Sequence, residues 1–289
     1  MSNFTDFIGG GGGLPVNIIL GYSQTWVPPV DGNICIHVVG AGGGGHANNN
    51  SAYIRSGGAG LGTGQDDRIK GGGAGGYCKK NSLAVTTSGS FTVVVGAGGD
   101  GHYANTPGDD GGNTTVAGTG LGSTLTANGG DGAVFNAHGA GGTASGGDVN
   151  NTGGSGGFYG GGAVGITGTG NAPPSGNNRD YQFGAACDVI GPESLMGYGY
   201  ICGGRGGDSY NVYTPSTTSG TSPTSPPNGG FLAGGGMLGL KGSGNNGDIH
   251  GGAGGIGGGG GAAWNNFSQN AVVGGQGGNG IVIIQYLPA

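Results

Sequence analysis

Charged residues are scarce in this chain, and basic ones are the scarcest. Lys and Arg together contribute 8 residues and Asp and Glu 14, which gives a formal net charge of −6. A protein that binds nucleic acid or an anionic lipid surface needs a basic patch that neutralises phosphates. The composition therefore disfavours both kinds of partner.

Long apolar runs and helical periodicity are also missing. No run approaches the roughly 20 apolar residues that span a bilayer, so we expect no membrane insertion. Residues 1–13 lack the basic and apolar regions of a secretory signal, so action outside a cell would need another exit, such as release with a virion. Apolar residues do not recur at helical spacing, and each glycine in a helix costs about 0.5–1 kcal/mol relative to alanine. We therefore expect essentially no α-helix.

Cysteine occurs only four times, and none of the four forms a CxxC pair or has the histidine spacing of a zinc site. We interpret them as small buried apolar residues, and disulfide pairing is the less favoured alternative. The four are Cys35, Cys78, Cys187 and Cys202.

Motifs for cofactors and metals are weak. Residues 40–45 and 96–101 both match G-x-G-x-x-G after an apolar run, but HANNNSAY and HYANTPGDD follow instead of the helix that a dinucleotide site requires. Asp66–Asp67 and Asp109–Asp110 could coordinate calcium, although adjacent acids in a turn are more often solvated. No serine, histidine and acid stand in the arrangement of a nucleophilic site. We expect no cofactor, no metal and no enzymatic activity.

Glycine is what the chain has in abundance, with 84 of its 289 residues, together with 12 prolines. Such a composition often means disorder, but disordered chains are usually highly charged, and only 8% of this chain is charged. Collagen is excluded because glycine lacks a period of three and comes in runs such as Gly9–Gly13 and Gly257–Gly261. A polyproline-II helix exposes all its backbone hydrogen-bonding groups, so many glycine tracts can pack side by side and bond to each other. We predict a bundle, or sandwich, of glycine-rich polyproline-II helices.

Four short runs are rich in β-branched residues and abut glycine, which is typical of strands. The first and last of them could pair and close the domain. We predict one glycine-rich domain over residues 14–289, with a few short strands near its termini, and a short attachment segment over residues 1–13. The predicted strands are Asn17–Leu20, Ile34–Val39, Phe91–Val95 and Ile281–Tyr286.

The segments that link the tracts are polar and carry many of the aromatic residues. Rigid aromatic rings beside Asn, Ser, Thr and Gly are typical of protein surfaces that recognise a partner, although such rings could also cap the ends of a bundle. The candidate recognition residues are Tyr53, Arg55, Tyr103, Tyr181, Phe183, Tyr210, Tyr213, Trp264 and Phe267. Phe4, Phe7 and Ile8 are candidates for an apolar attachment anchor.

Two stretches carry a resemblance to a known family. QTWVPPVDGNICIHVVGAGGGG (24–45) and GGQGGNGIVIIQY (274–286) resemble the glycine-rich domain of bacteriophage tail-fibre proteins. The chain also resembles, more loosely, the tip adhesins of T-even-like phages, which are sandwiches of polyproline-II helices with variable receptor-binding loops. Unlike those adhesins, only about 13 residues precede the domain here.

The resemblance implies a receptor-binding protein on a phage tail fibre, with a bacterial surface protein or polysaccharide and other virion proteins as partners. A homotrimer would fit tail-fibre symmetry, and a single copy would fit the adhesins. A purely structural virion component and an antifreeze-type protein with a flat polyproline-II face are the alternatives. The expected location is an external appendage of the virion.

Overall fold

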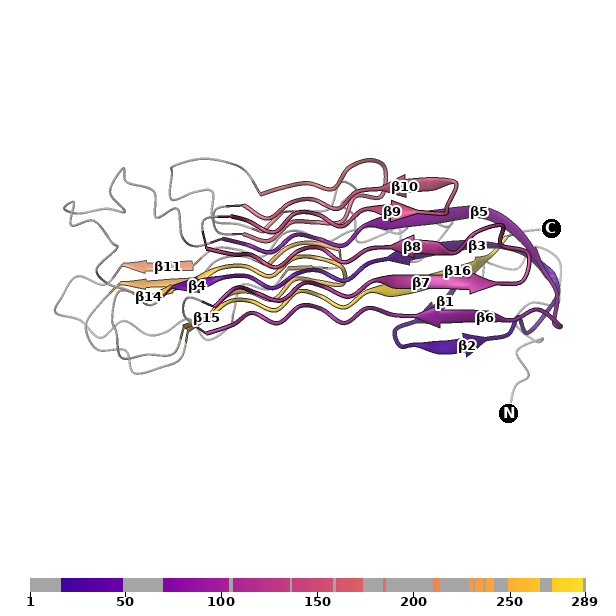
Figure 1. Cartoon of the computed structure of the whole chain (residues 1–289), viewed down its shortest axis with the longest axis horizontal. Coiled ribbons are helices and arrows are strands. Elements are labelled where there is room, and N and C mark those ends of the chain that lie inside the picture. Colours follow the sequence, from indigo (N-terminus) through magenta and orange to yellow (C-terminus); the bar gives the residue numbers. More distant parts are fainter. Residues whose placement is uncertain are drawn as a thin grey trace.

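The computed structural model describes residues 17–48, 70–103, 106–135, 137–157, 160–173, 184–185, 210–213, 229–230, 232–235, 238–241, 249–265 and 272–287. Within these ranges there is no helix, as the glycine content predicts, and none that could cross a membrane. Strands gather at the two ends of an elongated molecule, and strand-free segments run between them (Figure 1).

The first antiparallel sheet, sheet A, brings the two ends of the described chain together. β1 pairs with β16, and Ile19 lies opposite Ile283, so the predicted pairing of the first and last strands is confirmed. Sheet A has the order β1 (Asn17–Leu20), β16 (Ile281–Tyr286), β3 (Gly32–Val39), β5 (Tyr77–Val85) and β10 (Val149–Asn151).

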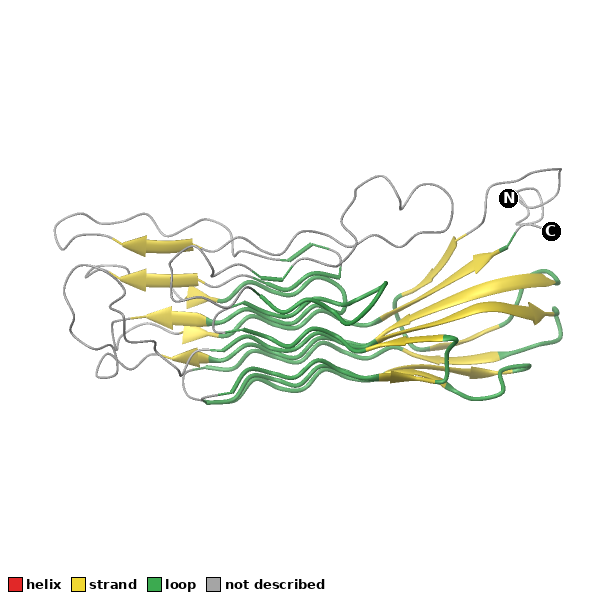
Figure 2. Ribbon diagram, turned by 90° about the horizontal axis from the view of Figure 1, so that it is seen from above, coloured by secondary structure: helices red, strands yellow, loops and turns green. Residues whose placement is uncertain are grey.

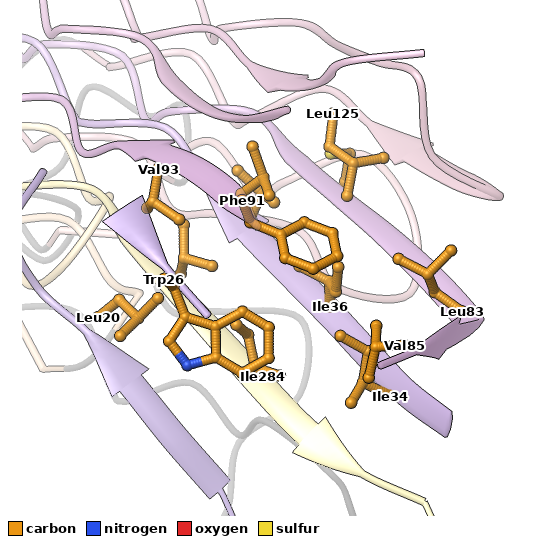
Figure 3. Close-up of a cluster of buried hydrophobic side chains, with 14 of the residues drawn as sticks. Leu20, Trp26, Ile34, Ile36, Leu83, Val85, Phe91, Val93, Leu125 and Ile284 are labelled. Atoms are coloured by element: carbon orange, nitrogen blue, oxygen red, sulfur yellow. The ribbon is translucent and has the colours of Figure 1, made fainter. Parts of the chain in front are cut away.

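The second antiparallel sheet, sheet B, packs face to face on sheet A. Alternating exposure in β6, where Phe91 and Val93 are buried, directs one face of sheet B toward the strands of sheet A. Trp26 and Phe91 of sheet B lie 5.5 Å apart between ring centroids and share one core with Ile36 and Ile284 of sheet A (Figure 3). Sheet B has the order β2 (Gln24–Trp26), β6 (Phe91–Val94), β7 (Thr114–Gly118), β8 (Leu125–Ala127) and β9 (Ala144–Ser145).

The prediction that strands lie only near the termini was wrong. β5, β7, β8, β9 and β10 come from the middle of the sequence and complete both sheets. β5 has the sequence YCKKNSLAV, in which Lys79 to Ser82 interrupt the apolar pattern, because this part of the strand is half-exposed or exposed. A search for runs of β-branched residues misses strands of this kind, since their partners rather than their own propensity hold them.

Beyond the sheets, the glycine tracts run side by side and bond to one another in a repeating pattern. In residues 40–46, successive N–H groups donate to three different tracts, and the partner repeats at every third residue. The distances lie between 2.8 and 3.1 Å. Gly40, Gly43 and His46 donate to the carbonyls of Gly76, Gly73 and Lys70; Ala41 and Gly44 to those of Gly112 and Asp109; Gly42 and Gly45 to those of Gly278 and Gly275.

The carbonyls of the same tract accept from three further tracts. Gly130 and Ala133 donate to one side of residues 40–46, Gly99 to a second side and Gly260 to a third. Three tracts that accept and three that donate therefore surround this one. A Cβ on Gly43 would overlap the carbonyl group of Asp131, so such close approach requires glycine.

Six strands with parallel pairing form the end opposite the sheets, which we call the tip (Figure 2). β11 (Tyr210–Tyr213), β12 (Leu238–Lys241), β14 (Ala263–Asn265) and β4 (Ala47–Asn48) form a four-stranded sheet in that order. β13 (Ile249–His250) pairs with β15 (Val272–Val273). Within each of these two sheets the strands run in the same direction along the bundle, so their pairing is parallel.

Candidate recognition surface at the tip

The tip sheet brings together residues that are far apart in the sequence, among them three of the predicted recognition residues. Tyr210 and Tyr213 begin and end β11, where they pair with Leu238 and Lys241 of β12. Trp264 lies in β14, which pairs with the other side of β12 and with β4. Residues about 50 positions apart thus lie in one sheet at the end of the bundle.

Tyr103 is the predicted recognition residue whose environment is described most fully. It follows the tract of residues 96–101, and its side chain is 52% exposed. A β-bridge joins it to Val273 of β15, and its carbonyl accepts from the N–H of Thr106. Beside it, His102 Nε2 lies 2.9 Å from Asp109 Oδ2, which ties together the two tracts that this turn connects. Tyr103 is therefore exposed on an anchored turn.

A second turn at the tip presents apolar residues that the sequence-based prediction missed. Val134 and Phe135 are 42% and 49% exposed, and a bridge between Val134 and Ala137 closes the turn. The Phe135 ring meets the ring of buried His46 edge-on, at 6.4 Å between centroids. The signal was present in AVFNAHG, where two large apolar residues stand in a short connection between glycine tracts.

The remaining candidates lie outside the described residues. These are Tyr53, Arg55, Tyr181, Phe183 and Phe267 among the recognition residues, and Phe4, Phe7 and Ile8 in the attachment segment. Of the two calcium candidates, Asp66–Asp67 is likewise outside. Asp109 pairs with His102, and Asp110 Oδ1 accepts from the N–H of Gly132 at 2.8 Å. In the described ranges no three His, Cys, Asp or Glu side chains converge on a point where a metal could bind.

The face of sheet A that points away from sheet B holds a buried polar cluster with a thiol and an imidazole. His37 Nε2 lies 3.0 Å from Gln285 Oε1 and 3.3 Å from Cys35 Sγ, and Nδ1 lies 2.8 Å from the Tyr77 hydroxyl. In the tautomer that fits these partners, Nε2–H donates to Gln285 and Nδ1 accepts from Tyr77. Burial lowers the pKa of His37 to about 4 and raises the pKa of the Cys35 thiol. The pair is thus neutral at pH 7, and Cys35 offers no thiolate nucleophile.

Cys35 and Cys78 are both buried and both free, as expected for small apolar residues, whereas Cys187 and Cys202 lie outside the described ranges. Burial also raises the pKa of Cys78, to about 12. The two thiols belong to neighbouring strands, but Cys78 lies in the core between the sheets and Cys35 on the opposite face of sheet A. They therefore serve packing.

Comparison with known proteins gives one family. A family model described as a glycine-rich domain matches residues 19–287, which include both antiparallel sheets apart from the first two residues of β1, the glycine tracts and the strands of the tip. No curated protein matches the chain.

Proposed function

The chain belongs to the glycine-rich domain family, and from this premise we propose that it is a receptor-binding protein of a bacteriophage tail fibre. In this proposal it recognises a bacterial surface protein or polysaccharide with residues at its tip and performs no catalysis. Other virion proteins hold its sheet end, on an external appendage of the particle. The phage origin rests on the resemblance of residues 24–45 and 274–286 to tail-fibre domains.

We further propose that the tracts are polyproline-II helices packed as a sandwich. A polyproline-II helix has three residues per turn and no internal hydrogen bonds, so its N–H groups point in three directions in turn. The repeat of hydrogen-bond partners at every third residue of 40–46 supports this assignment. The tract of residues 70–76 has the same repeat, since Gly71 and Ala74 donate to Gly157 and Gly154.

The observation that carries the recognition proposal is the exposure of Tyr103 and Phe135 on two anchored turns at the tip. Half-exposed aromatic rings held by a stiff scaffold lose little conformational entropy on binding, which favours affinity. A bundle in which each tract bonds to several others resists bending, so it can present such rings at a fixed distance from the sheet end. A purely structural component would not require exposed rings there.

Binding of fluorescently labelled protein to a panel of bacterial strains tests the proposal. On a bacterial strain to which the wild-type protein binds, the double variant Tyr103→Ala, Phe135→Ala should bind at least about tenfold more weakly than the wild type. The reason is that truncation of an interface aromatic commonly costs more than about 1 kcal/mol of binding free energy. Tyr22→Ala is the matched control, since Tyr22 is 70% exposed at the sheet end. Unchanged binding of the double variant would reject the tip as the recognition surface.

The position of the protein on the virion distinguishes the proposed adhesin from a purely structural component. Immunogold labelling of virions with antibodies against the chain should mark the distal end of a tail fibre, and those antibodies should block adsorption. Labelling along a fibre shaft or over the capsid, without an effect on adsorption, would favour the structural alternative.

A further inference from the structure

Four tracts form an outer wall of the bundle, and each continues a strand of sheet B. They are residues 96–103 after β6, 107–113 before β7, 128–134 after β8 and 137–143 before β9. Exposed residues recur at every third position along them, as in Ala97, Asp100 and Tyr103. The wall therefore has an ordered outer surface, and among the described residues its tracts have fewer neighbouring tracts than the six that surround residues 40–46.

The N–H groups of residues 128–134 find their acceptors in two different ways. As in residues 40–46, they point in three directions with a period of three. Gly130 and Ala133 donate to Ala41 and Gly44, and Asn128 and Asp131 to Thr143 and Ala140, in each case to backbone carbonyls. The third direction, that of Gly129 and Gly132, meets side chains instead.

Two side chains of the neighbouring tract supply the acceptors for this third direction. Gly129 N–H donates to Asn113 Oδ1 at 2.9 Å, and Gly132 N–H donates to Asp110 Oδ1 at 2.8 Å. Asn113 and Asp110 are both exposed and lie three residues apart in their own tract. This spacing matches that of Gly129 and Gly132, whose N–H groups donate to them. The same device recurs where Gly98 N–H donates to Asn279 Oδ1 at 2.8 Å.

We propose that Asp110, Asn113 and Asn279 take the place of the backbone carbonyls of a further tract. By accepting from these N–H groups, they prevent a glycine tract of a second copy of this chain from binding to the wall. An uncapped row of N–H groups at every third residue is complementary to the carbonyls of another glycine tract, just as the open edge of a sheet is complementary to a strand. The sequence is rich in such tracts, so each copy carries the segment that would dock. This inference is independent of the proposed function.

Amide hydrogen exchange and sedimentation velocity of the double variant Asp110→Ala, Asn113→Ala test the proposal. The amides of Gly129 and Gly132 should exchange about tenfold faster, because each loses its acceptor. The sedimentation coefficient should rise with protein concentration in this variant and stay constant in the wild-type protein. Faster exchange without association would overturn the blocking role, and unchanged exchange would overturn the capping role.

The matched control is the double variant Asp100→Ala, Asn128→Ala. It makes the same change of composition and charge on the same wall, but these side chains bond to the Gln276 and Thr143 side chains rather than to backbone N–H groups. It should leave the exchange of Gly129 and Gly132 and the sedimentation unchanged; association of this control would reject the proposal. Asp110→Asn keeps the Oδ1 acceptor and should behave as wild type. If the first double variant does not fold, Asn113→Ala alone should accelerate exchange of Gly129 and not of Gly132.

Discussion

At the scale of single residues, His37 shows how a polar side chain can be accommodated next to the core. Its ring has a partner on each nitrogen, Gln285 on one side and Tyr77 on the other, and these come from the strands on both sides of β3. The neutral ring satisfies both contacts, whereas a proton on Nδ1 would remove the acceptor that the Tyr77 hydroxyl uses. Sequence alone did not single out His37, because its partners are 40 and 248 residues away.

The stability of the protein should therefore fall between pH 6.5 and pH 4. Burial lowers the pKa of His37 from 6.5 to about 4, so within this window the unfolded state binds a proton that the folded state does not. Stability is then lost as pH falls through the window, by up to about 3 kcal/mol, and the loss levels off below pH 4. Urea unfolding at pH 7, 5.5 and 4.5 of wild type and His37→Gln measures the difference, because the carboxylates titrate in both. Equal pH dependence in the two proteins would contradict the prediction.

At the scale of the elements, the glycine tracts depend on contact between backbones. Asp131 and Gly132 lie where a side chain on Gly43 would have to go, and both belong to another tract. A tract cannot move away from a substituted glycine without breaking its hydrogen bonds to several other tracts. The same residue type is free of this constraint outside the bundle, where a Cβ on Gly122 would meet nothing within 4 Å.

Gly43→Ala should consequently destabilise the fold by about 3 kcal/mol or more, at the upper end of what overpacking costs. Gly122→Ala should change the free energy of unfolding by less than about 1 kcal/mol, with stabilisation expected if the backbone geometry suits alanine. Urea denaturation followed by tryptophan fluorescence compares the two, since Trp26 lies in the sheet core. Similar stabilities of the two variants would show that the tracts can spread apart.

The strands were only partly predictable from their own sequences. Asn17–Leu20 and Ile281–Tyr286 have the bounds that their β-branched runs predict, and the other two predicted runs match β3 and β6 to within two residues. β7 and β8 were missed because TTVAG and LTA are short: their Thr and Val residues favour strands, but Ala or Gly ends each segment before a longer β-branched run forms. Pairing with the neighbouring strands completes these segments.

At the scale of the whole molecule, the tracts separate two ends with different properties. The tracts run between the sheet end and the tip (Figure 1). The sheet end holds the core of large apolar side chains, whereas Tyr103 and Phe135 are half-exposed at the tip. Little apolar surface connects them, because the bundle between them is mostly backbone. Residues at the tip can therefore vary without disturbing the core, which would suit the proposed recognition of different surfaces.

Substitutions at the two ends should act independently. Ile284→Ala removes a fully buried side chain of the sheet core and should cost about 2–5 kcal/mol. Phe135→Ala at the tip should cost less than about 1 kcal/mol, because half of that side chain is already exposed. The double variant should equal the sum within about 0.5 kcal/mol, since the sites share no partner. A larger coupling in a double-mutant cycle would mean that the bundle transmits packing changes between its ends.

The sequence by itself determined the building material of this protein and its broad class. So much glycine excludes helix, low charge opposes disorder, and β-branched runs next to glycine define the strands that close the domain. Only the tertiary structure decided which tract lies beside which, because glycine has no side chain that could specify a neighbour. Gly42, Gly43 and Gly44 look alike in the sequence, yet they donate to the carbonyls of Gly278, Gly73 and Asp109, and these partners are known only once the chain has folded. The same holds for Asp110 and Asn113, whose exposed side chains acquire a structural role from the N–H groups of the tract beside them.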